Sequence, residues 1–179
     1  MRHLLFAALA LASPALADCP PPPDISQDEA RLIAEVRVAP NEYAAQKISN
    51  QLWALWAKAP DEAAQALLDR GMAARVGYDF LGAIEAFDRL TAYCPDYAEG
   101  YNQRAFVNFL RQDYEAALVD LELAIERSPR HIAAIAGKAL TLIGLKRDDE
   151  AQRVLREALA LNPWLAERRY LTDPDATDL

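Results

Sequence analysis

The chain has 179 residues, of which 53% are hydrophobic and only six are glycine, and its formal net charge is -8. This length suffices for one domain with a sizeable core, and a composition rich in alanine and leucine favours helices. The negative charge argues against a nucleic-acid backbone or an anionic membrane surface as partner, because both attract clustered lysine and arginine.

Residues 1–17 have the pattern of a secretory signal peptide. A basic start is followed by an apolar run over residues 4–12, which is too short to span a bilayer, and a small-x-small site ends at Ala17. An ordinary amphipathic helix is the alternative, but the run has no polar face. Cleavage of a lipoprotein before Cys19 is disfavoured because Asp18 is acidic. We therefore expect a protein that is cleaved after Ala17, is periplasmic or secreted, and has no membrane anchor.

The exported chain would contain two cysteines, Cys19 and Cys94. An even number of cysteines in an oxidising compartment suggests a disulfide, and two free thiols are the alternative. Closing so long a loop would stabilise the fold by about 4 to 5 kcal/mol in the chain-entropy model. The spacing matches neither a CxxC redox motif nor a zinc site.

A 34-residue period runs through the second half of the chain, where Pro95, Pro129 and Pro163 follow one another at that spacing. Other positions recur with the prolines. They are an alanine (Ala83, Ala117, Ala151), a large apolar residue (Phe87, Leu121, Leu155) and a basic residue (Arg70, Arg104, Lys138).

This pattern resembles the tetratricopeptide repeat, a unit of 34 residues folded as two antiparallel helices. The resemblance implies an all-α fold, a right-handed α-solenoid with units at 64–97, 98–131 and 132–165. The basic residues depart from the family's pattern, which has leucine at that position. We expect Arg104 to form a partly buried ion pair with Asp120 on the paired helix.

The turn between the second and third units contains His131, the only histidine beyond the predicted signal peptide. In this register Ser128 caps a helix that starts at Pro129, and His131 belongs to an inter-repeat turn rather than to a catalytic site.

Segments outside the three units complete the predicted architecture. Residues 18–25 form a proline-rich lead-in, and residues 26–60 form a helical pair that begins with a capping box of Ser26 and Glu29. If the 34-residue register continues backwards, this helical pair is a degenerate repeat. Ser49 then lies at the alanine position of the pattern, Trp53 at its large apolar position and Trp56 at a second alanine position. Residues 166–179 form a short closing helix and a disordered tail.

The sequence contains no motif of an enzyme. Phosphate-binding glycine loops, the GxSxG elbow and HExxH are absent, and one histidine makes a metal site or a Ser–His pair improbable. The acidic run 148–150 lies at a predicted helix start, where carboxylates complement the helix dipole. We therefore predict no catalytic residue, no cofactor and no metal.

In the tetratricopeptide superfamily the first helix of each unit lines a concave, ligand-binding face. Carried onto this chain, the register exposes Gln65, Glu99, Ala133 and Ala136 there, together with the candidate binding residues Leu68, Met72, Arg75, Asn102, Phe106, Phe109, Leu140 and Ile143. One branch of the superfamily binds the C-termini of chaperones with lysines and asparagines at the fifth and ninth positions of each repeat. That clamp is missing here, because the ninth positions hold Met72, Phe106 and Leu140.

These positions predict an apolar groove with one polar residue, Asn102, and an aromatic pair at its centre. The groove would suit an amphipathic helix or an extended apolar peptide, unless the helix over residues 41–58 or Trp164 fills it. The prediction is an exported repeat protein that binds a protein or peptide partner in the bacterial cell envelope, and not nucleic acid. A structural subunit of an envelope assembly is the alternative, and an enzyme a distant third.

Overall fold

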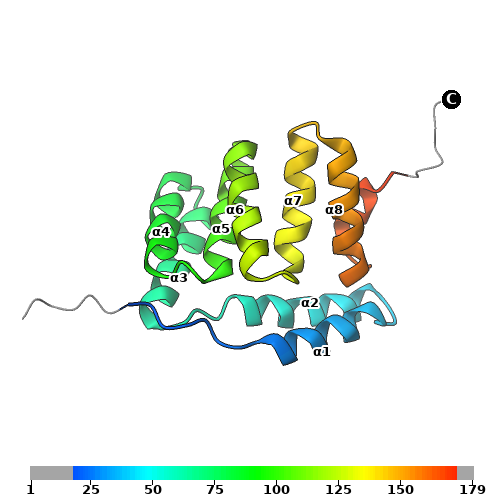
Figure 1. Ribbon diagram of the computed structural model, residues 1–179, viewed down its shortest axis with the longest axis horizontal. Coiled ribbons are helices and arrows are strands. Elements are labelled where there is room, and N and C mark those ends of the chain that lie inside the picture. The colour runs from blue at the N-terminus through cyan, green and yellow to red at the C-terminus, as the bar shows by residue number, and fades with distance from the viewer. Residues whose placement is uncertain (1–17, 173–179) are drawn as a thin grey trace, which may run out of the picture.

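The computed structural model describes residues 18–172, so the predicted signal peptide and the last seven residues lie outside the described part of the chain. The described residues form α-helices and one 3-10 helix, with no strand among them. Six helices stand side by side as a stack, and two lie across one end of it (Figure 1). Their bounds are α1 Ser26–Arg37, α2 Glu42–Trp56, α3 Glu62–Val76, α4 Phe80–Tyr93, α5 Ala98–Leu110, α6 Tyr114–Arg127, α7 Ile132–Gly144, α8 Asp148–Leu161 and the 3-10 helix η1 Ala166–Tyr170.

The stack consists of three antiparallel helix pairs, α3/α4, α5/α6 and α7/α8, and each pair packs against the next through α4–α5 and α6–α7. The predicted all-α solenoid of helix pairs is thereby confirmed. None of the helices within residues 18–172 is long and apolar enough to cross a membrane.

Small residues let the helices of the stack approach closely, as the 34-residue pattern predicted. Ala83, Ala117 and Ala151 are all fully buried in the second helices of the three pairs. A methyl group added at Gly71 would collide with the ring of Phe87, which is itself fully buried. The large residue of one helix therefore occupies the space that the small residue of its neighbour leaves free.

The turns inside the pairs are as periodic as the helices. Tyr78, Gln112 and Lys146 each adopt a positive φ, of 61°, 61° and 62°. The next residue caps the second helix in two of the pairs, where Asp79 accepts the N–H of Gly82 and Asp113 accepts that of Ala116. A left-handed residue followed by a capping aspartate reverses the chain within a few residues.

The predicted ion pair of Arg104 and Asp120 is present and bidentate. Arg104 Nε lies 2.9 Å from Asp120 Oδ2, Nη2 lies 2.6 Å from Oδ1, and the Asp120 side chain is 5% exposed. The same guanidinium contacts Asp88 and Thr91 on α4, so it joins the first pair to the second. The hydrogen bonds that Arg104 donates to Asp120 raise the pKa of Arg104 above its ordinary value.

The inter-repeat turn differs from its prediction. Ser128 does not cap a helix at Pro129, because α6 ends at Arg127 and α7 begins only at Ile132. Ser128 and Pro129 instead form a tight turn, in which the His131 N–H donates to the Ser128 carbonyl. The cap of α7 is the buried imidazole of His131, whose Nδ1 accepts the N–H of Ala134. The inter-repeat turn itself agrees with the prediction.

The helices α1 and α2 do not continue the solenoid as a degenerate repeat would. They lie across the ends of the stacked helices, and α1 packs against both α2 and α8 (Figure 1). The capping box is also absent, since no side chain caps α1 and the carboxylate of Glu29 is buried. Glu29 accepts the indole N–H of Trp56 at 3.0 Å and pairs with Arg130 at 3.0 Å, so it joins α1 to α2 and to the inter-repeat turn.

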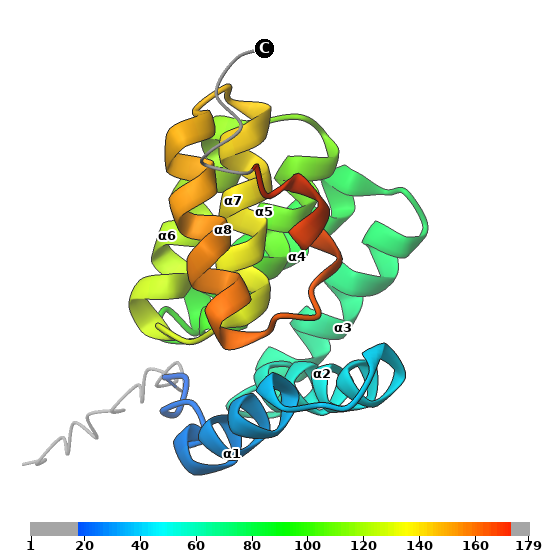
Figure 2. The ribbon, with the colours of Figure 1, turned by 90° about the vertical axis from the view of Figure 1, so that its right-hand side faces the viewer.

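Two further segments attach the ends of the described chain to the stack. The lead-in is joined to the end of α4 by a disulfide between Cys19 and Cys94, whose Cα atoms are 5.2 Å apart. After α8 the chain turns back along the stack as η1 (Figure 2). This closing segment is a single 3-10 helix of five residues, shorter and tighter than the predicted closing helix.

Candidate functional site: a hollow on the inner face of the stack

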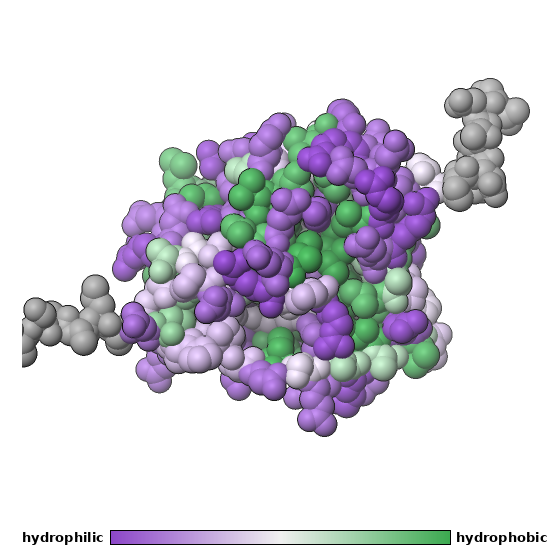
Figure 3. Space-filling model, viewed as in Figure 1, coloured by the Kyte–Doolittle hydropathy of each residue, from purple (hydrophilic) through white to green (hydrophobic). Residues whose placement is uncertain are grey.

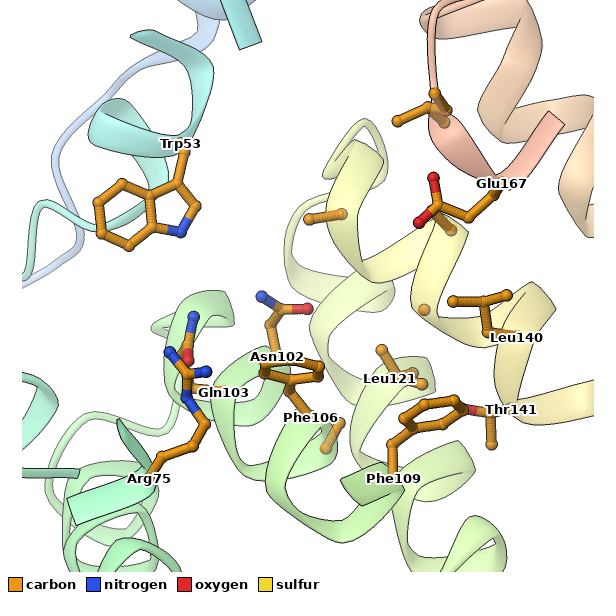
Figure 4. Close-up of a pocket in the computed structure, with 15 residues that line it drawn as sticks. Trp53, Arg75, Asn102, Gln103, Phe106, Phe109, Leu121, Leu140, Thr141 and Glu167 are labelled. Atoms are coloured by element: carbon orange, nitrogen blue, oxygen red, sulfur yellow. The ribbon is translucent and has the colours of Figure 1, made fainter. Parts of the chain in front are cut away.

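A hollow of about 350 Å³ lies between α2, the first helices of the pairs and the segment around η1 (Figure 4). Its volume is within the range of ligand-binding clefts. Figure 3 shows one face of the molecule, which is hydrophilic around its edges and has hydrophobic residues gathered toward its middle. The hollow is lined by Trp53, Arg75, Asn102, Gln103, Ala105, Phe106, Phe109, Leu121, Ala133, Ala136, Gly137, Leu140, Thr141, Leu165 and Glu167.

Five of the eight candidate binding residues line this hollow: Arg75, Asn102, Phe106, Phe109 and Leu140. Phe106 is the most available of the apolar ones, with 41% of its surface exposed. Phe109 is half-buried and meets the ring of Tyr114 edge-on at 5.5 Å. The central helix α5 therefore presents an aromatic pair to the hollow.

The other three candidates, Leu68, Met72 and Ile143, do not line it. Leu68 is fully buried in a core that includes Ala59, so the chain entering α3 covers the position that the register exposes. Met72 is half-buried against the same core. Ile143 packs against a cluster around Leu142. The predicted exposure of Leu68 is wrong, because the chain entering α3 covers it. Met72 and Ile143 are half-buried and lie outside the hollow.

Glu99, expected on the exposed concave face, is buried instead and organises a polar cluster. Its carboxylate accepts hydrogen bonds from Asn102 at 3.0 Å and from Gln103 at 2.6 Å. His131 Nε2 lies 2.8 Å from the same carboxylate. Because His131 Nδ1 accepts a backbone N–H, Nε2 carries the proton and donates to Glu99. Asn102 is therefore a buried support, 8% exposed, rather than the free polar handle expected of it.

The polar character of the hollow comes from other atoms. Arg75 Nε, Gln103 Oε1 and Thr141 Oγ1 are buried atoms without a hydrogen-bond partner among residues 18–172, and all three residues line the hollow. Buried polar atoms are nearly always paired, so three unpaired atoms in residues that border one space are unusual. The atoms themselves are closed to solvent, so a ligand in the hollow reaches them only when their side chains turn.

Arg75 is held against the aromatic wall. Its guanidinium carbon lies 4.8 Å from the centroid of the Phe106 ring, a cation–π distance. Burial lowers the pKa of Arg75 from its ordinary value, and the charge of Glu99 opposes that shift. No carboxylate in the described chain forms an ion pair with it.

The protein's own segments border the hollow without filling it. Trp53 of α2 faces the hollow and is 44% exposed, while Leu165 and Glu167 approach from the segment after α8 (Figure 4). Trp164, a candidate for filling the groove, packs instead against the cluster of α1 and α2 around Leu32. Sequence reasoning missed both Trp53 and Glu167 as residues of the hollow. The repeat register gives Trp53 a packing position, and no local pattern points to Glu167.

The hollow is lined mainly by apolar side chains. Within residues 18–172 there is no group of three or more histidine, cysteine, aspartate or glutamate side chains that could hold a metal ion. The hollow combines apolar side chains with a few convergent polar ones, which is the composition of a ligand site.

These features define a class of protein: a solenoid of antiparallel helix pairs with a hollow along the first helices. Residues 109–167 match the family Tetratricopeptide repeat. A TPR repeat-containing protein of Rhizobium etli is 32% identical over 81 residues, which cover 45% of this chain and 40% of that protein. Human Tetratricopeptide repeat protein 36 is 33% identical over 116 residues, covering 62% of this chain and 60% of the relative. The chain is thus similar to tetratricopeptide-repeat proteins, with the family match over residues 109–167, and it spans less than two thirds of the length of these curated relatives.

Solved structures agree with this assignment of the fold. The Arabidopsis OM64 TPR domain superposes with a TM-score of 0.59 at 22% identity, covering 60% of this chain and 89% of that one. The second TPR domain of human RPAP3, in complex with the HSP70 peptide SGPTIEEVD, gives 0.59 at 25% identity, covering 61% and 92%. The TPR2B domain of yeast Sti1, in complex with an Hsp70 peptide, gives 0.55 at 25% identity, covering 56% and 81%.

Proposed function

We propose that this protein binds a protein or peptide partner in the hollow between α2, α3, α5 and α7, and that it does not act as an enzyme. The observation that carries the proposal is Phe106, which stays 41% exposed in a hollow whose lining also includes three unpaired buried polar atoms. An exposed aromatic ring at the centre of a concave site is a typical binding hot spot. Two of the similar solved structures are complexes with peptides, which supports the same use of the hollow here.

We further propose that the protein acts in the bacterial cell envelope or outside the cell. The pattern of residues 1–17 supports export. The disulfide of Cys19 and Cys94 supports an oxidising compartment, because such bonds persist there and are rare in the cytosol. Fractionation of the bacterium followed by N-terminal sequencing tests this part. A cytosolic protein that begins at Met1 would contradict it, and an envelope protein that begins at Asp18 would support it.

The binding proposal is tested with a phage-displayed peptide library selected on the immobilised wild-type protein. Selected peptides are measured again on Phe106→Ala and on Val119→Ala, which removes an apolar side chain that is 58% exposed on α6 and outside the hollow. We expect binding to fall at least tenfold in Phe106→Ala and to be unchanged in Val119→Ala, with both variants folded. Selected peptides that bind all three proteins equally would refute the proposal.

A further inference from the structure

Glu167 gives one end of the hollow an unpaired negative charge. The side chain is half-buried on η1 and has no ion-pair partner in the described chain. The neighbouring arginines are engaged elsewhere, since Arg168 contacts Glu42 and the Trp164 carbonyl, and Arg169 lies over the ring of Tyr170. A half-buried carboxylate without a counter-ion favours a cationic group in the ligand.

The opposite wall is arranged for a main-chain amide. The carboxylate of Glu99 can only accept, so the amide nitrogen of Gln103 must face it, and Gln103 Oε1 is left as a free acceptor. Arg75 Nε is a free donor on the same side of the hollow, as Figure 4 shows. A peptide group presents one N–H and one carbonyl, which complement this acceptor and this donor.

The charges around Arg75 disfavour an acidic ligand. Arg75 is the only cation among the described residues that line the hollow, and its charge is already opposed by the buried Glu99. Its guanidinium also lies against Phe106 rather than toward open solvent. The whole chain has a net charge of -8, so its long-range field attracts basic ligands and repels acidic ones.

We propose that the hollow binds an internal, extended peptide segment with an apolar side chain near a basic one. The apolar side chain contacts Phe106, Phe109 and Leu140, and the basic side chain pairs with Glu167. The side chains of Arg75 and Gln103, whose unpaired atoms are closed to solvent, turn on binding to pair with the segment's main-chain amide. This inference rests on the proposed peptide-binding function and adds the chemistry of the partner. It differs from recognition of the acid-ended peptide SGPTIEEVD in the RPAP3 complex, because no cationic clamp is present among the described residues that line this hollow.

The test uses synthetic nine-residue peptides, acetylated and amidated, with one leucine in a serine–glycine background. A lysine is placed at each of four positions on either side of the leucine, and matched peptides carry glutamine or glutamate there. One further peptide ends in a free carboxylate after two glutamates. Binding is followed by the fluorescence of Trp53, which lines the hollow, with Trp53→Phe as the control for the origin of the signal.

We expect the best lysine peptide to bind more tightly than its glutamate counterpart. Glu167→Gln should weaken the lysine peptide about three- to tenfold at low salt and leave the glutamine peptide unchanged. The matched control Glu157→Gln removes an exposed carboxylate of α8 outside the hollow and should change neither. N-methylation of the leucine amide should weaken binding to the wild type, and it tests the amide contact without altering the protein.

The outcomes separate this inference from the proposed function. If the peptides bind in a Phe106-dependent way but glutamate peptides or the acid-ended peptide bind as tightly as the lysine ones, the inference is overturned and the proposed function stands. The same conclusion follows if Glu167→Gln behaves like Glu157→Gln. If no peptide from this set or from the library binds in a Phe106-dependent way, both are overturned.

Discussion

The stack α3–α8 and the crossing pair α1/α2 are held by different kinds of contact. In the stack, buried alanines and large apolar residues recur at the same positions of each helix pair. The crossing pair adds buried polar contacts that occur once: Trp56 stacks on His131 with ring centroids 4.2 Å apart, and Tyr97 donates to the Trp56 carbonyl. The stack is therefore held by the same packing contacts repeated in each helix pair, whereas the crossing pair depends on a few individual contacts.

Loss of the disulfide should lower the stability of the protein more than any other change proposed below. It closes a loop with a sequence separation of 75 that contains both helices of the crossing pair and the first pair of the stack. Replacing both Cys19 and Cys94 by serine should lower the free energy of unfolding by about 4 kcal/mol, through the greater entropy of the unfolded chain. Urea denaturation of the variant and the oxidised wild type measures this. Equal midpoints would show that the bridge constrains neither region.

Asp120→Ala should destabilise the stack nearly as much. It leaves the guanidinium of Arg104 without its buried partner, which costs on the order of 3 to 5 kcal/mol. The next repeat offers a matched control, because Lys138 pairs with Glu122, whose side chain is 55% exposed, and Glu122→Ala should cost less than about 1 kcal/mol. Thermal unfolding of the two variants compares the pairs. Equal losses would mean that burial does not distinguish them.

His131→Phe should loosen the start of α7 in the stack more than the crossing pair. The ring can still stack on Trp56, but Glu99 loses a donor and the Ala134 N–H loses its acceptor, at a cost of about 1 to 3 kcal/mol. Hydrogen exchange measured residue by residue should become faster at the start of α7 and change less in α2. If the start of α7 remains as protected as in the wild type, the imidazole does not stabilise that helix end.

Phe106→Ala should have the smallest effect on stability, because the ring lies in the hollow that both regions border. With 41% of its surface exposed, its removal should cost less than about 1 kcal/mol. Phe87, fully buried in the stack, is the matched control, and Phe87→Ala should cost about 3 to 5 kcal/mol. Differential scanning calorimetry compares the two. A large loss in Phe106→Ala would mean that the hollow is part of the core.

The sequence could predict part of the candidate site. The register placed Phe106 and Phe109 in the hollow because residues three apart on one helix share a face. It misplaced Leu68 and Glu99, which occupy equally regular positions, because α2, the chain entering α3 and the inter-repeat turn bury them. It also could not assign Trp53 or Glu167 to the hollow, since both come from segments outside the repeats.

The sequence by itself determined the helical-repeat fold and the ion pair of Arg104 with Asp120. The physical reason is that the packing contacts of the helix pairs recur every 34 residues and so leave a periodic pattern in the sequence, while the ion pair joins residues only 16 apart on two paired helices. Only the tertiary structure decided where α1 and α2 lie, which candidate residues are exposed, and which polar atoms face the hollow unpaired. Those features depend on single contacts between distant segments, such as Arg130 with Glu29 and Asn162 with Ser49, and such contacts leave no periodic trace in the sequence.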